Sequence, residues 1–520
     1  MDASYMVAVA LAMAVWYGWK FLEWIWLKPK RMEKHLASQG FRGNPYRIMY
    51  GDLKDYSAAI KQARSAPITF SDDILKRIFP FLHQNVQTYG KNTFIWIANI
   101  PRVYIMEPDL IKEVLSKNFN YLKAQTNPLT KLLVTGVATY DLDQWTKHRK
   151  IVNPAFHMEK LKLMLPAFQV SCGDMITAWQ KAMKTSKELD IWPYFQSLTA
   201  DAISRTAFGN SYEQGRKIFK LLQIQADLLT QALRSIYIPG SRFLPTKRNM
   251  RMKSIYKELD DLLIDLIKRR MKDLEAGEAN KEDLLNILLE CNNREANQHQ
   301  AVSKHGKKIN MGMTIKDVVE ECKLFYFAGQ ETTSSLLLWT MYLLSQHQEW
   351  QHRAREEVLQ VFGKNNKPDF DGLNRLKIVT MILYEVLRIF PPAAELNRFI
   401  KEDVKLGESL HLQAGTSINL PIIFVHQDKE IWGDDAKEFK PERFAEGILK
   451  ATKGQVSYFP FSCGPRVCVG QNFSMLEAKM TIAMILQRFA FELSPNYIHA
   501  PYYVLTIQPQ FGVQLIMHEI

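Results

Sequence analysis

One cysteine stands in a loop whose composition suits a metal-bound thiolate. The stretch FSCGPRVCVG, residues 461–470, places Cys468 two residues after Arg466 and just before a long apolar-periodic segment. Gly464 and Gly470 allow backbone N–H groups to approach the sulfur, while a cation and the dipole of a following helix favour the thiolate. Cys468 is therefore a candidate metal ligand, although an ordinary packed cysteine in a turn fits the same residues taken alone.

Cys463 introduces a competing interpretation, an iron–sulfur cluster. Its spacing from Cys468 matches the first two ligands of a plant-type ferredoxin site, which requires another cysteine three residues further on. Gln471 occupies that position, so the iron–sulfur interpretation fails.

The loop as a whole resembles the haem-binding signature of the cytochrome P450 family, Phe-x-x-Gly-x-Arg-x-Cys-x-Gly, and every fixed position is met. The resemblance implies haem b as the cofactor, with the Cys468 thiolate as the axial ligand of its iron. It also implies that Arg466 pairs with a haem propionate and that Phe461 packs beside the thiolate. Cys463 has no fixed role in the family.

A long helix is expected to position a second group of polar residues. Thr314 and Asp317 form a capping box that predicts the start of this helix, which runs to about Gln346. Within it, the stretch AGQETTSS, residues 328–335, lies between apolar segments, so its polar groups should be buried and either paired or functional. A helix–helix contact through small residues, with hydroxyls bonded to the preceding turn, is the alternative.

The same stretch resembles the oxygen-binding groove of the family. Glu331 and Thr332 match its acid and alcohol pair, which the resemblance implies to be catalytic. Thr332 would hold a proton-bearing water network and Glu331 would relay protons from solvent. Ala328 and Gly329 would leave room over the haem iron.

A charged pair on another helix has a structural interpretation. Glu385 and Arg388 lie three residues apart on one helix face, which in isolation is an ordinary surface pair. They resemble the family's Glu-x-x-Arg motif, whose partner arginine falls in a Pro-Glu-Arg-Phe segment, here Arg443. The resemblance implies a buried charged network that stabilises the fold around the haem.

Two further matches concern the haem propionates. Trp145 and Arg149, four residues apart, resemble the family pair that holds a propionate, and Arg398 stands where many members place another propionate-binding arginine. Substrate contacts are expected over the haem, from Phe325, Ala328, Ala394, Glu395, Leu396 and Leu505.

Other basic residues have two open interpretations. Lys147, His148 and Lys150 share the helix of Trp145 and form either a solvated face or part of a basic surface that docks a reductase. His426 is expected to be a buried structural histidine rather than an axial ligand.

The N-terminal segment predicts a membrane anchor. Residues 3–27 are mostly apolar and long enough to cross a bilayer as a helix. Positive charge follows at once, which places the rest of the chain on the cytosolic side. We expect residues 1–30 to form a single-pass anchor and stop in the endoplasmic reticulum membrane, and residues 31–520 to form one haem-thiolate catalytic domain.

Composition restricts the function classes. The chain has 520 residues, 47% of them apolar, and a formal net charge of +13. Its basic residues are spread along the chain, so no nucleic-acid partner is predicted. Five scattered cysteines, an odd number, argue against a disulfide framework and suit a reducing compartment.

The expected fold is mainly α with a smaller β portion, the cytochrome P450 fold. Residues 94–97 and 102–106 predict a hairpin, and the polar residues 291–310 predict an exposed loop. Pro29 is expected to help break the chain after the anchor. Further helices are predicted at 161–183, 218–233, 254–274 and 350–362.

The resemblance implies a monooxygenase that inserts one atom of dioxygen into a C–H bond of a hydrophobic plant metabolite. Three stretches, at 39–46, 324–333 and 382–388, resemble the plant clan that contains secologanin synthase and triterpenoid side-chain oxidases. We expect a terpenoid substrate, triterpenoid or iridoid, and electrons from NADPH-cytochrome P450 reductase, with cytochrome b5 as a further optional donor. The alternatives are an oxidase that inactivates a hormone such as a gibberellin or brassinosteroid, an isomerase or dehydratase of the same fold, and a haem sensor.

Overall fold

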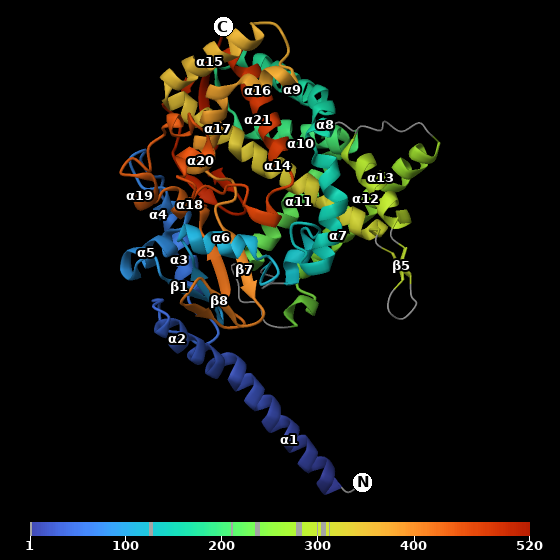
Figure 1. The fold of residues 1–520 in the computed structure, drawn as a ribbon, viewed down its shortest axis with the longest axis vertical. Helices are drawn as coiled ribbons and strands as arrows, with labels where there is room; N and C mark the ends of the chain where they lie inside the picture. Colours follow the sequence, from blue (N-terminus) through green and yellow to red (C-terminus); the bar gives the residue numbers. More distant parts are fainter. Residues whose placement is uncertain are drawn as a thin grey trace.

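A mostly helical body carries one long helix that projects from it (Figure 1). The structure is a computed structural model and describes residues 3–123, 128–209, 212–233, 240–276, 283–298, 300–302, 308–310 and 312–520. The prediction of a mainly α fold with a smaller β portion is confirmed.

The helices of the first half are α1 (Ala3–Leu22), α2 (Lys28–Ser38), α3 (Leu53–Ala63), α4 (Leu75–Ile78), α5 (Pro80–Tyr89), α6 (Pro108–Ser116), α7 (Leu142–Val152), α8 (Met158–Leu163), α9 (Leu165–Met183), α10 (Trp192–Phe208), α11 (Tyr212–Leu233) and α12 (Lys247–Glu275). Those of the second half are α13 (Leu284–Gln298), α14 (Ile315–Gln346), α15 (Gln348–Phe362), α16 (Phe370–Arg375), α17 (Lys377–Ile389), α18 (Ile422–His426), α19 (Lys429–Trp432), α20 (Ile448–Ala451) and α21 (Gln471–Leu486). Short 3-10 turns are η2 (Pro128–Leu132), η3 (Asn153–Phe156), η4 (Ser241–Phe243), η5 (Pro441–Phe444) and η6 (Gly464–Arg466).

The largest sheet has five strands in the order β1-β2-β10-β7-β3. Its strands are β1 (Phe94–Ile97), β2 (Ile100–Tyr104), β3 (Tyr121–Lys123), β7 (Leu396–Ile400) and β10 (Ser417–Leu420). Only β2 and β10 pair in parallel. The smaller sheets contain β4 (Glu188–Asp190), β5 (Gln300–Val302), β6 (Lys308–Asn310), β8 (Val404–Leu406), β9 (Leu410–Leu412), β11 (Phe489–Leu493), β12 (Pro501–Tyr503), β13 (Ile507–Pro509) and β14 (Gln514–Glu519). The predicted hairpin is β1 and β2, with Ile97 opposite Ile100.

The N-terminal helix does not break at Pro29, contrary to the expectation. A π-helical segment, η1 (Glu23–Leu27), joins α1 to α2, and Pro29 lies in the first turn of α2. The extra residue of a π segment accommodates the proline ring and its missing N–H. The hydroxyl of Tyr46 donates to the carbonyl of Ile25, 2.8 Å away, which Pro29 cannot bond in an α-helix. The helix therefore runs unbroken from the apolar segment into the body.

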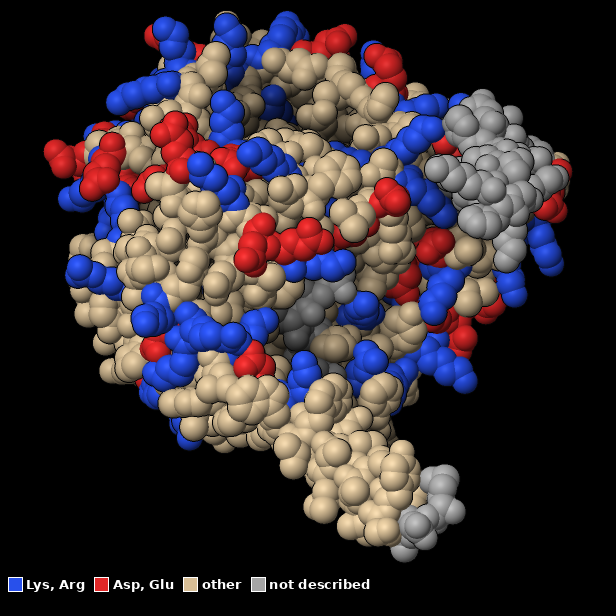
Figure 2. Space-filling view, turned by 60° about the horizontal axis from the view of Figure 1, so that its bottom comes forward, with Lys and Arg blue, Asp and Glu red and all other residues tan. Residues whose placement is uncertain are grey.

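This helix changes character along its length. The helix that begins at Ser4 is long and apolar enough to span a membrane, and the side chains of residues 4–22 are exposed. In α2, Met32 and Leu36 are buried in the core of the body. Figure 2 shows the projecting part as an uncharged surface, with Lys and Arg side chains gathered on the body around its base. This arrangement fits a single-pass anchor whose basic end faces the body.

The long helix α14 passes through the middle of the body (Figure 1). Its capping box is present: the Thr314 hydroxyl accepts from the Asp317 N–H at 3.1 Å, and the Asp317 carboxylate accepts from the Thr314 N–H at 2.9 Å. The apolar residues of its second half are buried on all sides, where α10, α17 and α21 pack against the helix. A helix held this firmly is a rigid support for the polar stretch within it.

The prediction of an exposed loop at residues 291–310 is wrong for the part of this range that the structure describes. Helix α13 continues to Gln298, and β5 pairs with β6 in a short antiparallel ribbon. Apolar residues at 284–289 are buried against the body, and this packing extends the helix into a sequence with weak local signals.

Candidate functional site

A cavity of about 370 Å³ lies between α14 and the loop that precedes α21. Ten of the candidate site residues from the sequence line it, and they come from four separate parts of the chain. They are Trp145, Arg149, Phe325, Ala328, Gly329, Thr332, Leu396, Phe461, Arg466 and Cys468. Residues that are up to 323 positions apart in sequence, from Trp145 to Cys468, therefore border the same cavity.

The cysteine loop presents its sulfur to this cavity. The Cys468 N–H donates to the Phe461 carbonyl at 2.8 Å, which closes the loop, and Gly470 immediately precedes α21. Gly464 has φ +69°, and a Cβ there would lie 2.7 Å from the Leu115 carbonyl oxygen, so this turn requires glycine. The Cys468 side chain is open to the cavity although it lies deep inside the protein.

The charge beside the sulfur comes from a different arginine than expected. Burial raises the pKa of the Cys468 thiol, while the Gly470 N–H and the positive charge of Arg149 act to lower it. Arg466 instead turns toward Tyr140 and Asp141, donating to the Tyr140 carbonyl at 2.8 Å and to Asp141 Oδ1 at 2.6 Å. Because burial dominates, the thiolate needs a bound metal to be stable at neutral pH.

Positive side chains gather along one side of the cavity. Arg466 stacks on Trp145, with 4.6 Å from its Cζ to a ring centroid. Arg398 of β7 does not line the cavity itself, but it pairs across the sheet with Lys123 of β3, which does. The Nε atoms of Arg398 and Arg466 are buried without an acceptor in the part of the chain that the structure describes. Burial and the neighbouring arginines lower the pKa of Lys123, and burial lowers the pKa of Arg398 to about 10.

These features fit a haem. The Cys468 thiol, which is open to the cavity, could serve as an iron ligand, and buried guanidinium groups with unused donors match a pair of carboxylates such as the haem propionates. Lys123, which the sequence patterns did not single out, joins the same cationic side of the cavity. Its only signal is its register opposite Arg398, which requires the sheet to be known.

Only some residues of the polar stretch 328–335 in α14 line the cavity. The Thr332 hydroxyl donates to the Ala328 carbonyl at 2.7 Å, the bond back to the preceding turn that the structural alternative predicts. Both residues line the cavity. A Cβ on Gly329 would lie 3.0 Å from Ile203, so the glycine also allows α10 to pack closely against α14.

Glu331 points away from the cavity lining. Its carboxylate accepts hydrogen bonds from the Thr506 hydroxyl at 2.9 Å and from the Gln508 amide. Burial raises the pKa of Glu331, and these two donors act to lower it. A glutamate with a raised pKa keeps its proton to a higher pH than a solvent-exposed one, which suits a group that delivers protons. In this conformation the Glu331 carboxyl lies outside the cavity lining, although its sequence neighbour Thr332 is part of that lining.

The charged network expected around Glu385 is present. Glu385 and Arg388 are both fully buried and form two bonds of 2.7 Å, while Arg443 lies 3.4 Å from the same carboxylate. Arg388 also donates to the carbonyls of His426, Ala436 and Glu438. The network thus connects α17 to the segment that leads toward the cysteine loop.

The substrate candidates divide into two groups. Phe325 and Leu396 line the cavity together with Ala328, whereas Ala394, Glu395 and Leu505 lie outside its lining. Ala394 is fully buried. Glu395 bonds to the amides of Asn397 and Asn419, at 3.4 and 2.6 Å.

His148 lies neither on a solvated face nor on a basic docking surface, the two interpretations offered for its helix. Its side chain is 1% exposed, and its Nδ1 lies 2.7 Å from Glu321 of α14. The Val137 N–H donates to the same carboxylate at 2.8 Å, so this pair holds the segment before α7 against α14. Lys147 and Lys150 remain at the surface, where Lys150 pairs with Glu295.

His426 is buried and structural, as expected. Its Nε2 accepts from the Phe459 N–H at 3.0 Å, and burial lowers its pKa to about 3, so the ring stays neutral.

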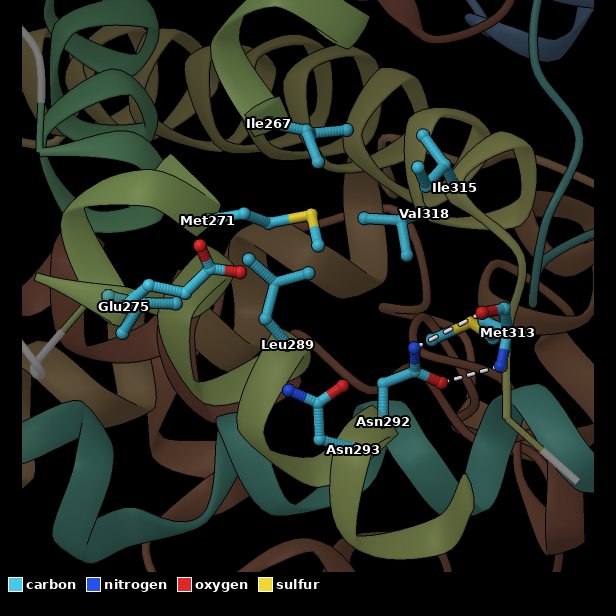
Figure 3. A pocket seen from close by; sticks show the side chains of 10 residues that line it. Ile267, Met271, Glu275, Leu289, Asn292, Asn293, Met313, Ile315 and Val318 are labelled. Atoms are coloured by element: carbon cyan, nitrogen blue, oxygen red, sulfur yellow. Dashed lines mark hydrogen bonds between the residues drawn. The ribbon is translucent and has the colours of Figure 1, made fainter. Parts of the chain in front are cut away.

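A second cavity, of about 260 Å³, lies between α12, α13 and the start of α14 (Figure 3). Apolar side chains such as Ile267 and Leu289 point into it, and Asn292 is occupied by two hydrogen bonds with the Met313 backbone. No candidate site residue from the sequence analysis lines this cavity.

Comparison with known proteins agrees with this site. Residues 72–511 match the family described as Cytochrome P450. The chain is 57% identical to Cytochrome P450 CYP72A219 of Panax ginseng, with 98% of both chains covered. It is 52% identical to secologanin synthase 1 of Catharanthus roseus, covering 98% of this chain and 97% of that protein. It is 51% identical to 7-deoxyloganic acid hydroxylase of the same plant, covering 99% of both. The chain belongs to the cytochrome P450 family and is a P450 monooxygenase.

Proposed function

We propose that this monooxygenase oxidises a terpenoid of the triterpenoid or iridoid class. The observation that carries the proposal is the cavity itself, which joins the Cys468 loop to a wall of mostly apolar side chains. The apolar lining includes Val137, Ile203, Leu324, Phe325, Leu336 and Leu396. Relatives named for the synthesis of secologanin and the hydroxylation of 7-deoxyloganic acid support the iridoid class.

Each residue at the cavity has a proposed role. Cys468 would hold the haem iron, and Arg149, Arg398 and Arg466 would hold its propionates, Arg398 and Arg466 with Nε donors that are buried without an acceptor among the described residues. When bound, the haem supplies dioxygen activation and the oxidising power for attack on a C–H bond. Thr332 donates a hydrogen bond at the cavity wall, and its hydroxyl can exchange the Ala328 carbonyl for a water.

Glu331 is proposed as the proton source for the groove. Its carboxyl must rotate from Thr506 and Gln508 to reach the water beside Thr332, a side-chain motion that is fast compared with turnover. We expect Glu331→Gln to lower product formation about a hundredfold, because a positioned acid typically contributes on that scale. Oxygen consumption should fall much less, so the ratio of product to oxygen consumed is the measurement. An unchanged ratio would remove Glu331 from the proton path.

Electrons are proposed to come from NADPH-cytochrome P450 reductase in the endoplasmic reticulum membrane, with cytochrome b5 as an optional second donor. The N-terminal helix supports this location, since its apolar part lies outside the body and its basic residues follow on the side of the body. The boundary between anchor and catalytic domain near residue 30 stays a prediction.

The test is turnover with a defined set of substrates. Microsomes that contain the full-length protein and a plant reductase are supplied with NADPH and, separately, with an iridoid, a triterpenoid, a gibberellin and a fatty acid. We expect a product heavier by one oxygen atom from a terpenoid substrate, and none from microsomes that carry Cys468→Ala. Oxidation of the gibberellin or the fatty acid alone would contradict the substrate class.

A further inference from the structure

A cluster of polar residues lies on one face of the five-stranded sheet, outside the lining of the cavity. Asn419 of β10 stands opposite Tyr104 of β2 on one side and Asn397 of β7 on the other. Arg102 points to the same face as Tyr104, because side chains alternate along a strand. Val103 and Arg398 occupy the opposite face by the same rule. We call Arg102, Tyr104, Glu395, Asn397, Asn419 and Tyr503 the Arg102 cluster.

Two atoms of this cluster are buried without a partner. Arg102 Nε has no acceptor and Asn419 Oδ1 has no donor among the described residues. The amide nitrogen of Asn419 is satisfied, since it donates to Glu395 at 2.6 Å and to Asn397 at 3.0 Å. Most buried polar atoms in proteins have a partner, so a donor and an acceptor left open in one cluster indicate a bound group that supplies both.

The charges of the cluster are separated rather than paired. Burial acts to lower the pKa of Arg102, but the neighbouring Tyr104 and Glu395 outweigh it and the pKa is raised. Arg102 therefore stays charged. Glu395 attracts it electrostatically, although no ion pair joins the two side chains in the part of the chain that the structure describes.

The cluster lies beside a segment that lines the cavity, and part of it reaches the surface. Glu395 directly precedes Leu396, which lines the cavity, as do Pro392 and Ala393 just before it. Arg102, Glu395 and Tyr503 are all partly exposed. The Tyr503 hydroxyl also interacts with the backbone of Ala394, so the tyrosine packs against the same segment. One short segment thus separates the apolar cavity from the polar cluster.

We propose that the Arg102 cluster binds a hydroxyl-rich group of the substrate, such as a glycosyl group, while the apolar part of that substrate occupies the cavity. A hydroxyl can accept a hydrogen bond from Arg102 Nε and donate one to Asn419 Oδ1, the two atoms that lack a partner, and a second hydroxyl can donate to Glu395. A carboxylate could pair with Arg102 alone and would face the negative charge of Glu395. Tyrosine rings beside amide and charged groups also suit the alternating apolar and polar faces of a sugar. The inference rests on the proposed terpenoid activity and specifies a substrate that carries such a group.

The experiment compares three ligands of one apolar skeleton: geranyl β-D-glucoside, geraniol and geranic acid. Their dissociation constants for the full-length, haem-loaded protein are measured from the shift of the haem absorption band on binding. We expect the glucoside to bind more tightly than geraniol, and Arg102→Gln to weaken glucoside binding about tenfold, the scale of one or two charge-assisted hydrogen bonds. Geraniol binding should change by less than about twofold, because it makes no such bonds.

Two further variants complete the test. Glu395→Gln should also weaken the glucoside, whereas an anion site would instead bind geranic acid more tightly after this change. Arg375→Gln, at an exposed arginine of α16, is the matched control and should change none of the constants. Equal binding of glucoside and geraniol by the unmodified protein, or equal losses for both ligands in Arg102→Gln, would overturn the proposal. The spectrum of the reduced carbon monoxide complex checks that the haem site is intact in each variant. Failure of the glucoside prediction is therefore seen in binding, whereas failure of the proposed function is seen as no oxidation of any terpenoid in the turnover test.

Discussion

Cys468→Ala is expected to abolish the thiolate-type Soret band of the reduced carbon monoxide complex and to lower turnover by more than about a thousandfold, the scale seen when a group at the reacting centre is lost. The reason is geometric. Cys468 presents its sulfur to the cavity that also contains Thr332, and no other cysteine lines that cavity. Cys468 would hold the haem iron through its thiolate, and the variant would lack the electron donation that this ligand supplies.

The matched control is Cys463→Ala, in the same loop. Cys463 is partly exposed, and its thiol has a pKa raised by burial, yet it does not line the cavity. We expect this variant to retain the Soret band and most of its turnover. If Cys468→Ala kept the band and Cys463→Ala lost it, the ligand assignment would be wrong.

Glu385→Ala should lower the free energy of unfolding by about 3–5 kcal/mol, as expected when one partner of a buried ion pair is removed. Arg388 would keep its bonds to backbone carbonyls but would lose both bonds to the carboxylate, and it is fully buried. The N–H of Lys440, which donates to Glu385 at 2.9 Å, would lose its acceptor as well. Urea unfolding of the full-length protein, followed by tryptophan fluorescence, measures the loss.

Glu438→Ala is the control for this prediction. The Glu438 side chain pairs with Lys440 at 2.9 Å and is 63% exposed, so its loss should cost less than about 1 kcal/mol. Arg388 bonds only the backbone carbonyl of Glu438, which the substitution leaves in place. Equal destabilisation by both variants would show that burial of the network contributes little.

Local patterns predicted the parts of the site that depend on neighbours in sequence. The capping box at Thr314 requires only Asp317, and the turn of the cysteine loop requires glycine at position 464. Both act within a few residues, so composition and spacing are sufficient. The resemblance to a known family supplied the remaining roles, including those of Trp145 and Arg398.

Contacts between distant segments were not predictable in this way. His148 pairs with Glu321, 173 residues away, and nothing in either local pattern indicates the partner. The hydrogen bonds of Glu331 reach β13 and the residue before it, more than 170 residues further on. Arg466 was expected beside the thiolate, but Asp141 competes for it at 2.6 Å. Orientation of a charged side chain depends on which opposite charge the fold brings near.

The unbroken helix through Pro29 makes the orientation of the enzyme in the membrane a rigid-body property. Since Met32 and Leu36 are buried in the body, a change in the tilt of the apolar segment must rotate the cavity and the Arg102 cluster by the same angle. Bilayer thickness, which sets helix tilt, would then decide at what depth the partly exposed residues of that cluster meet lipid or water. For a protein anchored by this helix, the composition of the membrane would then set how the cluster is presented to a substrate.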